Sequence, residues 1–117
     1  MQGVLRAGAF AAALSGLPII ACAAEYYMTG MGSKSCGQMI QDYRENADIY
    51  RDLYATWLVG FMSGSNSVCS KQARSDYYGS EAYLRKYCDQ NPLSHVATGA
   101  HKLRKELGGP ATPEDCK

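Results

Sequence analysis

Apolar residues recur at steps of three and four between Ile40 and Asn66, which is the period of one helix face. The members of this stripe are Ile40, Tyr43, Ala47, Tyr50, Leu53, Tyr54, Trp57, Leu58, Phe61 and Met62. Charged residues fill the other side of the stretch in its first half. A stripe this wide predicts a helix that packs into a small globular core. Gly60 and Gly64 stand four residues apart near its end, so we expect a second helix to approach the backbone closely there.

The start of this stretch carries a local helix signal. Ser35 and Gln38 have the spacing of a capping box, so we expect the first helix to begin at this point. Asn46 is expected to break or bend it before the main helix resumes, and helix propensity does not decide between one bent helix and two. Residues 64–67, Gly-Ser-Asn-Ser, are expected to end the main helix. Residues 25–34 contain glycines that break any period, so we interpret them as a flexible lead-in.

Two shorter helices are predicted after a polar connection. Ser80 is expected to cap the first of them, with Glu81 in its first turn. Asn91 is expected to cap the second, with Pro92 at the first helical position. Residues 108–110, Gly-Gly-Pro, are a strong stop. The pattern therefore predicts an all-α domain of four helices over residues 35–109, followed by a short tail over residues 110–117.

An apolar run with small residues at its end precedes these helices. Residues 1–6 carry one positive charge, residues 7–20 are apolar, and residues 21–24 are Ala, Cys, Ala and Ala. This layout predicts a secretory signal peptide over residues 1–23. Ordinary signal peptidase would use the small residues, whereas the lipoprotein enzyme would read residues 19–22, Ile-Ile-Ala-Cys, and leave Cys22 lipidated. Contact with a membrane is expected only in the second case, because the run is too short for a comfortable membrane span.

Four cysteines lie beyond this segment, at Cys36, Cys69, Cys88 and Cys116. An even number of thiols in a short exported domain predicts two disulfides, and the residues alone leave three connectivities open. No pair has the C-x-x-C spacing of a thioredoxin-like redox site. The cysteines therefore predict structural bridges in a protein exported from the cytoplasm.

The charge balance argues against a nucleic-acid partner. Without Arg6 the chain carries 11 basic and 11 acidic residues, and no run of Lys or Arg exceeds a pair. Acid changes this balance, because protonation of the 11 carboxylates and the two histidines would bring the formal charge to +13. Self-repulsion of that size would loosen the fold.

The residues offer little for catalysis. His95 and His101 are six apart, so they cannot form the i, i+4 metal pair of a helix. The serines form no G-x-S-x-G elbow. Asp48 and Asp52 lie one turn apart but alternate with arginines, which indicates a solvated, ion-paired face. We therefore expect no enzyme activity, no metal site and no cofactor.

Three patches together resemble a known family. They are residues 35–40 (SCGQMI), residues 56–64 (TWLVGFMSG) and residues 87–92 (YCDQNP). They are similar to the HdeA/HdeB family of small periplasmic acid-stress chaperones, over roughly residues 35–107. The resemblance implies a disulfide between Cys36 and Cys88. With that pair taken from the family, Cys69 and Cys116 have no family counterpart and are left as the second pair, which would tie the tail to the connection.

The resemblance implies a holdase that acid activates. At neutral pH the stripe around Trp57 would be buried, in a homodimer or a monomer, and acid would expose Tyr54, Trp57 and Phe61 to unfolded client proteins. An alternative comes from similar disulfide-bonded helical proteins of the Tai and Rap type, which are immunity proteins against type VI secretion toxins. In that case Tyr77 and Tyr78 are the expected anchors for one toxin. A third interpretation is an exported helical protein whose partner the residues do not identify.

Overall fold

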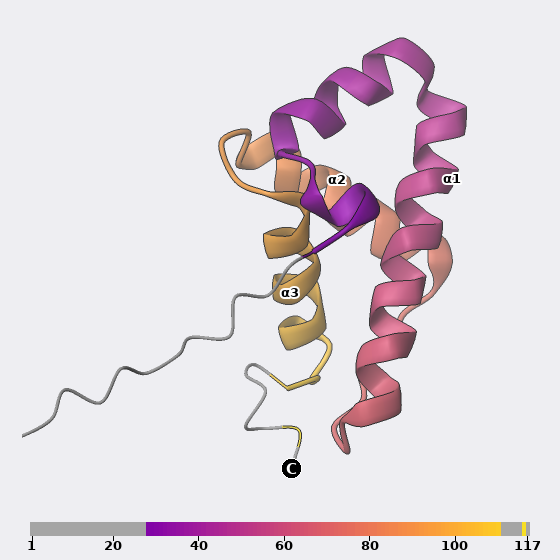
Figure 1. Ribbon diagram of the computed structural model, residues 1–117, viewed down its shortest axis with the longest axis vertical. Helices are drawn as coiled ribbons and strands as arrows, with labels where there is room; N and C mark the ends of the chain where they lie inside the picture. The colour runs from indigo at the N-terminus through magenta and orange to yellow at the C-terminus, as the bar shows by residue number, and fades with distance from the viewer. Residues whose placement is uncertain (1–27, 111–115, 117) are drawn as a thin grey trace, which may run out of the picture.

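The computed structural model describes residues 28–110 and residue 116 (Figure 1). Over these residues the chain forms helices and no strand, so the predicted all-α fold is confirmed. The elements are a 3₁₀ helix, η1 (Gly30–Ser33), and three α-helices, α1 (Cys36–Val68), α2 (Tyr77–Gln90) and α3 (Val96–Glu106). The expected signal peptide and Cys22 lie outside the described residues.

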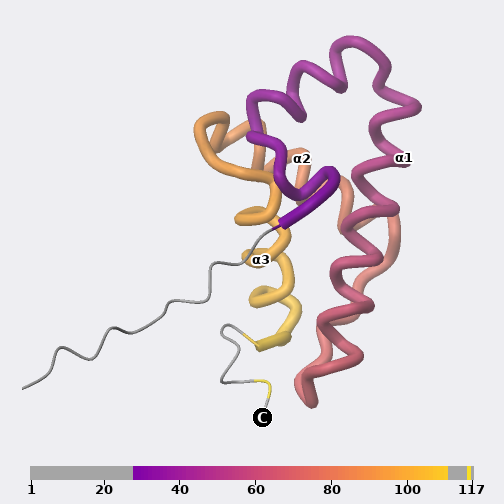
Figure 2. The backbone as a smooth tube through the Cα atoms, viewed as in Figure 1, coloured from indigo at the N-terminus to yellow at the C-terminus, as the bar shows by residue number. Residues whose placement is uncertain are grey.

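A sharp kink at Asn46 divides α1 into two segments, which Figure 2 shows as a change of direction in the chain. Asn46 has non-helical angles, with φ −157° and ψ 87°, and its Oδ1 accepts a hydrogen bond from the amide of Ile49 at 3.2 Å. The side chain that breaks the first segment therefore caps the second. The predicted capping box also forms, because Ser35 Oγ accepts from the amide of Gln38 at 3.1 Å and Gln38 Oε1 accepts from the amide of Ser35 at 3.0 Å.

The boundaries of α1 and α2 differ from those predicted. α1 continues through the polar residues 64–67 to Val68. The prediction that Ser80 caps α2 is wrong, since the helix begins at Tyr77, four residues before the expected start at Glu81. Asp76 is the cap, and its Oδ1 accepts from the amide of Gly79 at 2.7 Å. Aspartate caps helices as well as serine does, and the earlier start leaves Ser80 buried inside the helix.

The start of α3 was also predicted too early. Residues 91–94 form a turn in which the amide of Ser94 donates to the carbonyl of Asn91 at 2.9 Å, and α3 begins at Val96. The segment before α3 pairs with the residues that precede α1. The amide of Cys36 donates to the carbonyl of Ser94 at 2.8 Å, and the amide of Val96 donates to the carbonyl of Lys34 at 3.0 Å. The turn and this pairing keep residues 92–95 out of the helix, so α3 begins only at Val96.

The core lies between the second segment of α1, α2 and α3. Its fully buried large side chains include Tyr54, Leu58, Leu84 and Val96. The predicted stripe is only partly buried, because Leu53 is 44% exposed. The kink at Asn46 changes the phase of the pattern, so one continuous face does not run through both segments.

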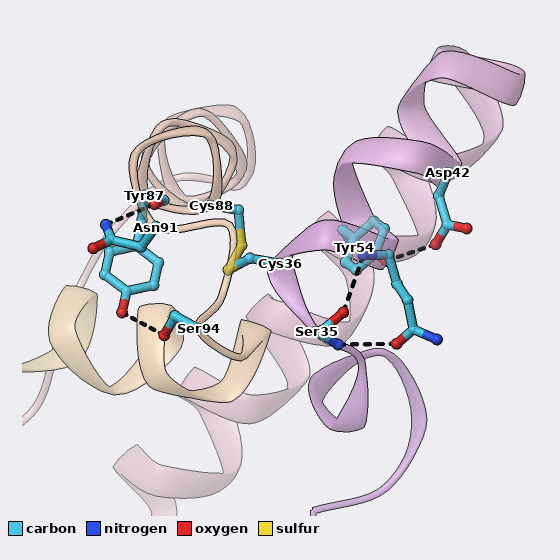
Figure 3. The surroundings of a disulfide bond; sticks show 9 residues. Ser35, Cys36, Asp42, Tyr54, Tyr87, Cys88, Asn91 and Ser94 are labelled. Carbon is cyan, nitrogen blue, oxygen red and sulfur yellow. Dashed lines mark hydrogen bonds between the residues drawn. A yellow bond between two sulfur atoms is a disulfide. The ribbon is translucent and has the colours of Figure 1, made fainter.

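Two disulfides close the fold. One joins Cys36 to Cys88, so the start of α1 is fixed to α2 (Figure 3). The other joins Cys69, which follows α1, to Cys116 in the tail. The first is the pair that the family resemblance implies, and the second is the pair that was left by elimination. Two disulfides indicate an oxidising compartment outside the cytoplasm.

Candidate functional site

An aromatic cluster forms where α1 faces α3. The rings of Trp57 and Phe61 stack with their centroids 5.5 Å apart, and the rings of Phe61 and His101 meet edge to face with their centroids 5.1 Å apart. The guanidinium of Arg104 lies 5.8 Å from the centre of the Phe61 ring. Burial against these groups, together with the positive charge of Arg104, lowers the pKa of His101 below its ordinary 6.5.

The 3₁₀ helix η1 covers this cluster. Its Gly32 is buried against the indole of Trp57, so closely that a Cβ on Gly32 would overlap Cζ2 and lie 2.7 Å from Cη2. Gly30 has φ +69° and also lies over the indole. Residues 30–33 were interpreted as part of a flexible lead-in, and that interpretation is wrong. The glycines there permit close contact with Trp57.

One carboxylate, on Asp42, links η1 to both segments of α1. Asp42 Oδ2 accepts from Lys34 Nζ at 2.6 Å and from the hydroxyl of Tyr54 at 2.7 Å. The Asp42 side chain is only 13% exposed, and Lys34 follows directly after η1. Desolvation by burial, and then the bond to Asp42, raise the pKa of Tyr54 far above its ordinary value. Tyr54 therefore stays protonated and donates to Asp42, as Figure 3 shows.

A second carboxylate, on Glu81, fixes the first segment of α1 to α2. Glu81 is 3% exposed and accepts from the hydroxyl of Tyr43, while Arg85 Nε lies 3.9 Å from its Oε1. Burial and the bond to Glu81 raise the pKa of Tyr43 well above its usual range. We call Asp42 and Glu81, with their donors, the two carboxylate contacts.

The five expected partner residues lie in two separate places. Tyr54 is fully buried beneath the first carboxylate contact, and Trp57 and Phe61 are half-buried under η1 and beside α3. Tyr77 instead packs outside α1, where its hydroxyl donates to the carbonyl of Asp52 at 3.1 Å. Tyr78 is 69% exposed and meets Tyr77 edge to face at 5.3 Å.

A third surface was missed by sequence reasoning. It is the outer face of α1, where Ile49 and Leu53 are 57% and 44% exposed and Gly60 and Gly64 lie open. The expectation that a second helix packs at Gly60 and Gly64 is wrong within the described chain, because a Cβ on either would meet nothing within 4 Å. The signal for this surface was available, since every residue from 53 to 68 is uncharged.

The remaining hollows are shallow. One of about 280 Å³ lies beside the first disulfide and is lined by Met39, Ile40, Tyr43, Arg44, Arg85, Cys88 and Asp89. Among residues 28–110 and 116, no three His, Cys, Asp or Glu side chains gather as metal ligands would. None of the helices within that same part of the chain has the length and apolar character needed to cross a membrane.

Comparison with known proteins gave no match: no family model, no curated protein and no solved structure is similar to this chain.

Proposed function

We propose that this protein is a periplasmic holdase that acid activates, as its resemblance to the HdeA/HdeB family implies. The observation that carries the proposal is the cover over Trp57. An aromatic cluster suited to binding apolar segments lies beneath η1, and the residue that follows η1 is paired to a carboxylate. A proton on that carboxylate is therefore a signal for opening the cover.

Acid acts on both carboxylate contacts in the same direction. Protonation of Asp42 removes its ion pair with Lys34 and weakens its bond with Tyr54. Protonation of Glu81 removes its attraction for Arg85 and weakens the bond that holds Tyr43. The rising positive charge of the chain adds repulsion. These changes loosen η1 and the first segment of α1.

The first disulfide limits how far this opening goes. Because Cys36 is bonded to Cys88, the first segment of α1 stays attached to α2 at one end and to the rest of α1 at the other. The residues before Cys36 have no such bond within the described chain. Opening therefore exposes Trp57 and Phe61 while the helices remain linked, which favours refolding when the pH returns to neutral.

The test is a pH series on the oxidised protein. Emission from Trp57, the only tryptophan, is recorded from pH 7 to pH 2, and aggregation of an acid-denatured client is followed in parallel. We expect a cooperative red shift that coincides with suppression of client aggregation. The Asp42→Asn variant keeps an acceptor for Tyr54 but loses the charge, so both changes should begin at a higher pH.

A matched control is Asp48→Asn, which removes a carboxylate from the same helix. The Asp48 side chain is 90% exposed, and its contact with Arg51 is 3.7 Å long. Asp48→Asn should therefore leave unchanged the pH at which Trp57 emission shifts and the pH at which client aggregation is suppressed. A Trp57 emission that stays buried down to pH 2, with the client aggregating as it does alone, would overturn the proposal.

An immunity protein against a type VI secretion toxin is the second candidate. The exposed ring of Tyr78, beside a Tyr77 fixed to α1 by its hydroxyl, is the arrangement that favours it. Exposed tyrosines on a rigid support are frequent anchors of tight interfaces. In this case one toxin should be recovered in stoichiometric amounts at pH 7, and Tyr78→Ala should weaken its capture without changing the acid response of Trp57.

A further inference from the structure

A hollow of about 200 Å³ lies between the later part of α1 and the connection that leads to α2. After Val68 the chain turns back along α1, as Figure 1 shows. The residues that line the hollow are Val59, Met62, Ser63, Asn66, Ala73, Arg74, Ser75 and Ser80. None of them is acidic, and none belongs to the aromatic cluster or to the two carboxylate contacts. The hollow is therefore separate from the cover over Trp57.

Asn66 fixes the connection on one side of this hollow. Its Oδ1 accepts from the amide of Ala73 at 2.9 Å, and its Nδ2 donates to the carbonyl of Ala73 at 2.7 Å. Ala73 is also only 2% exposed. Because both backbone polar groups of Ala73 are held, the next residue, Arg74, extends from a fixed point of the backbone. A support of this kind reduces the entropy that is lost when a ligand binds.

Arg74 gives the hollow a positive charge. No ion pair between described residues includes its guanidinium. Asp76 is close in the sequence, but it does not line the hollow, and its Oδ1 accepts from the amide of Gly79 as the cap of α2. A guanidinium presents parallel donors that match the oxygens of a carboxylate or a phosphate. An oxyanion is therefore the complementary ligand.

The other lining groups favour one kind of oxyanion. Ser63, Ser75 and Ser80 add hydroxyl groups that can donate to its oxygens, and Ser80 is only 2% exposed. Val59 and Met62 add an apolar side, which suits a ligand with an aliphatic part. A phosphate group carries a charge of about −1.5 to −2 at pH 7, which is more than one arginine neutralises. A carboxylate carries a single charge, so it fits this set of groups better.

We propose that this hollow binds a carboxylate that bears a short aliphatic group. The carboxylate lies against Arg74 and the serine hydroxyls, and the aliphatic group lies against Val59 and Met62. A free short-chain acid and the C-terminal residue of a protein both present this chemistry, and both match a hollow of about 200 Å³. Because the contacts come from α1, the connection and α2, the bound ligand should also raise the melting temperature.

The first test uses butyrate as the probe, with the oxidised, isotope-labelled protein at pH 7. Butyrate should cause saturable shifts in the NMR signals of the amides of Ser63, Ser75 and Ser80, and neutral butyramide should cause none. Arg74→Gln should raise the butyrate dissociation constant about tenfold or more, because a charge-assisted hydrogen bond is lost.

The matched control is Lys71→Gln. It removes the same charge from the same connection, but Lys71 is exposed and does not line the hollow. This variant should leave the butyrate dissociation constant unchanged. Shifts that do not saturate, or equal losses of affinity in Lys71→Gln and Arg74→Gln, would overturn the proposal, because a general attraction between charges would then explain them.

A second measurement distinguishes the two sources of the carboxylate. A short peptide that ends in valine with a free carboxyl group is compared with butyrate and with the same peptide amidated at its C-terminus. If the free peptide binds about tenfold tighter than butyrate or better, the ligand is the end of a protein chain, and otherwise it is a free acid. Equal binding of the amidated peptide, or tighter binding of inorganic phosphate than of butyrate, would overturn the proposal. These measurements use neither acid nor client, so their outcome is independent of the proposed function.

Discussion

The hydroxyl of Tyr54 donates a 2.7 Å hydrogen bond to Asp42 across the kink in α1. Tyr54 belongs to the second segment and Asp42 to the first, so this bond holds the two segments in their bent arrangement. Asp42 is also the partner of Lys34, directly after η1. The bend of α1 and the cover over Trp57 therefore depend on the same carboxylate.

Removing only the hydroxyl tests this relationship. Tyr54→Phe should lower the free energy of unfolding at pH 7 by about 1.5–3 kcal/mol, because a buried hydrogen bond to a charged group is lost. The difference from the wild type should shrink in acid, because a neutral carboxyl group accepts a weaker hydrogen bond than a carboxylate does. Denaturant unfolding at several pH values measures it, and Tyr78→Phe, whose hydroxyl is exposed, should stay within about 0.5 kcal/mol. A loss that is the same at every pH would contradict the role of Asp42.

The two disulfides should differ in their contribution to stability. They span 52 and 47 residues, so the chain-entropy model gives each about 4 kcal/mol. Both Cys36 and Cys88 are fully buried, so replacing them with alanine also leaves a cavity in the core. We expect the Cys36→Ala, Cys88→Ala variant to lose more than the Cys69→Ala, Cys116→Ala variant. If denaturant unfolding shows equal losses of unfolding free energy in the two variants, loop-closure entropy alone sets the contribution of each disulfide.

The sequence predicted those features that depend on neighbouring residues. The capping box at Ser35 and the interruption at Asn46 both form, because each involves a side chain and a backbone group within one turn. The start of α3 was missed for the converse reason. Asn91 and Pro92 carry a valid local signal for a helix start, but pairing between residues 34–36 and 94–96 overrides it. No local pattern reveals that pairing.

The candidate site shows the same division. Helical period placed Trp57 and Phe61 on one face, and they do stack. The cover over these two rings was not predicted. In the sequence Gly30 and Gly32 only interrupt the helical pattern, and their contact with the indole of Trp57 appears only in the folded chain. The contact between Asp42 and Tyr54 depends on the direction of the kink, which residue propensities do not specify.

Gly99 should be among the least replaceable residues of α3. Its Cβ position lies 2.6 Å from Tyr87 Cδ1 and 2.8 Å from Leu84 Cδ1, so alanine would force α2 and α3 apart. We expect Gly99→Ala to lower the free energy of unfolding by about 1–3 kcal/mol. Gly60→Ala is the opposite case and should raise it by up to about 1 kcal/mol, because the added Cβ meets nothing within 4 Å. Thermal or denaturant unfolding compares the two variants, and a neutral Gly99→Ala would contradict this packing.

His101 should add to the acid response at mild pH. Its folded pKa is lowered from 6.5 by burial against Phe61 and by Arg104. The folded state therefore prefers the neutral ring. The resulting stability is complete above pH 6.5 and is lost as pH falls through the lower folded value. His101→Gln should flatten this part of the stability curve, which unfolding between pH 7.5 and pH 5 measures. An NMR titration that places the His101 pKa at or above 6.5 would contradict it.

Gly32→Ala should open the cover over Trp57 without acid. The new Cβ would lie 2.7 Å from Trp57 Cη2 and 2.8 Å from Met28 Cγ, and the indole cannot retreat because it stacks on Phe61. We expect η1 to move instead, so acrylamide should quench Trp57 more strongly at pH 7. Gly37→Ala is the control, since its Cβ would make only ordinary contacts, the nearest at 3.5 Å. Unchanged quenching in Gly32→Ala would mean that η1 does not shield Trp57. If the same variant protects a client at a higher pH than the wild type does, the shield is linked to the proposed holdase activity.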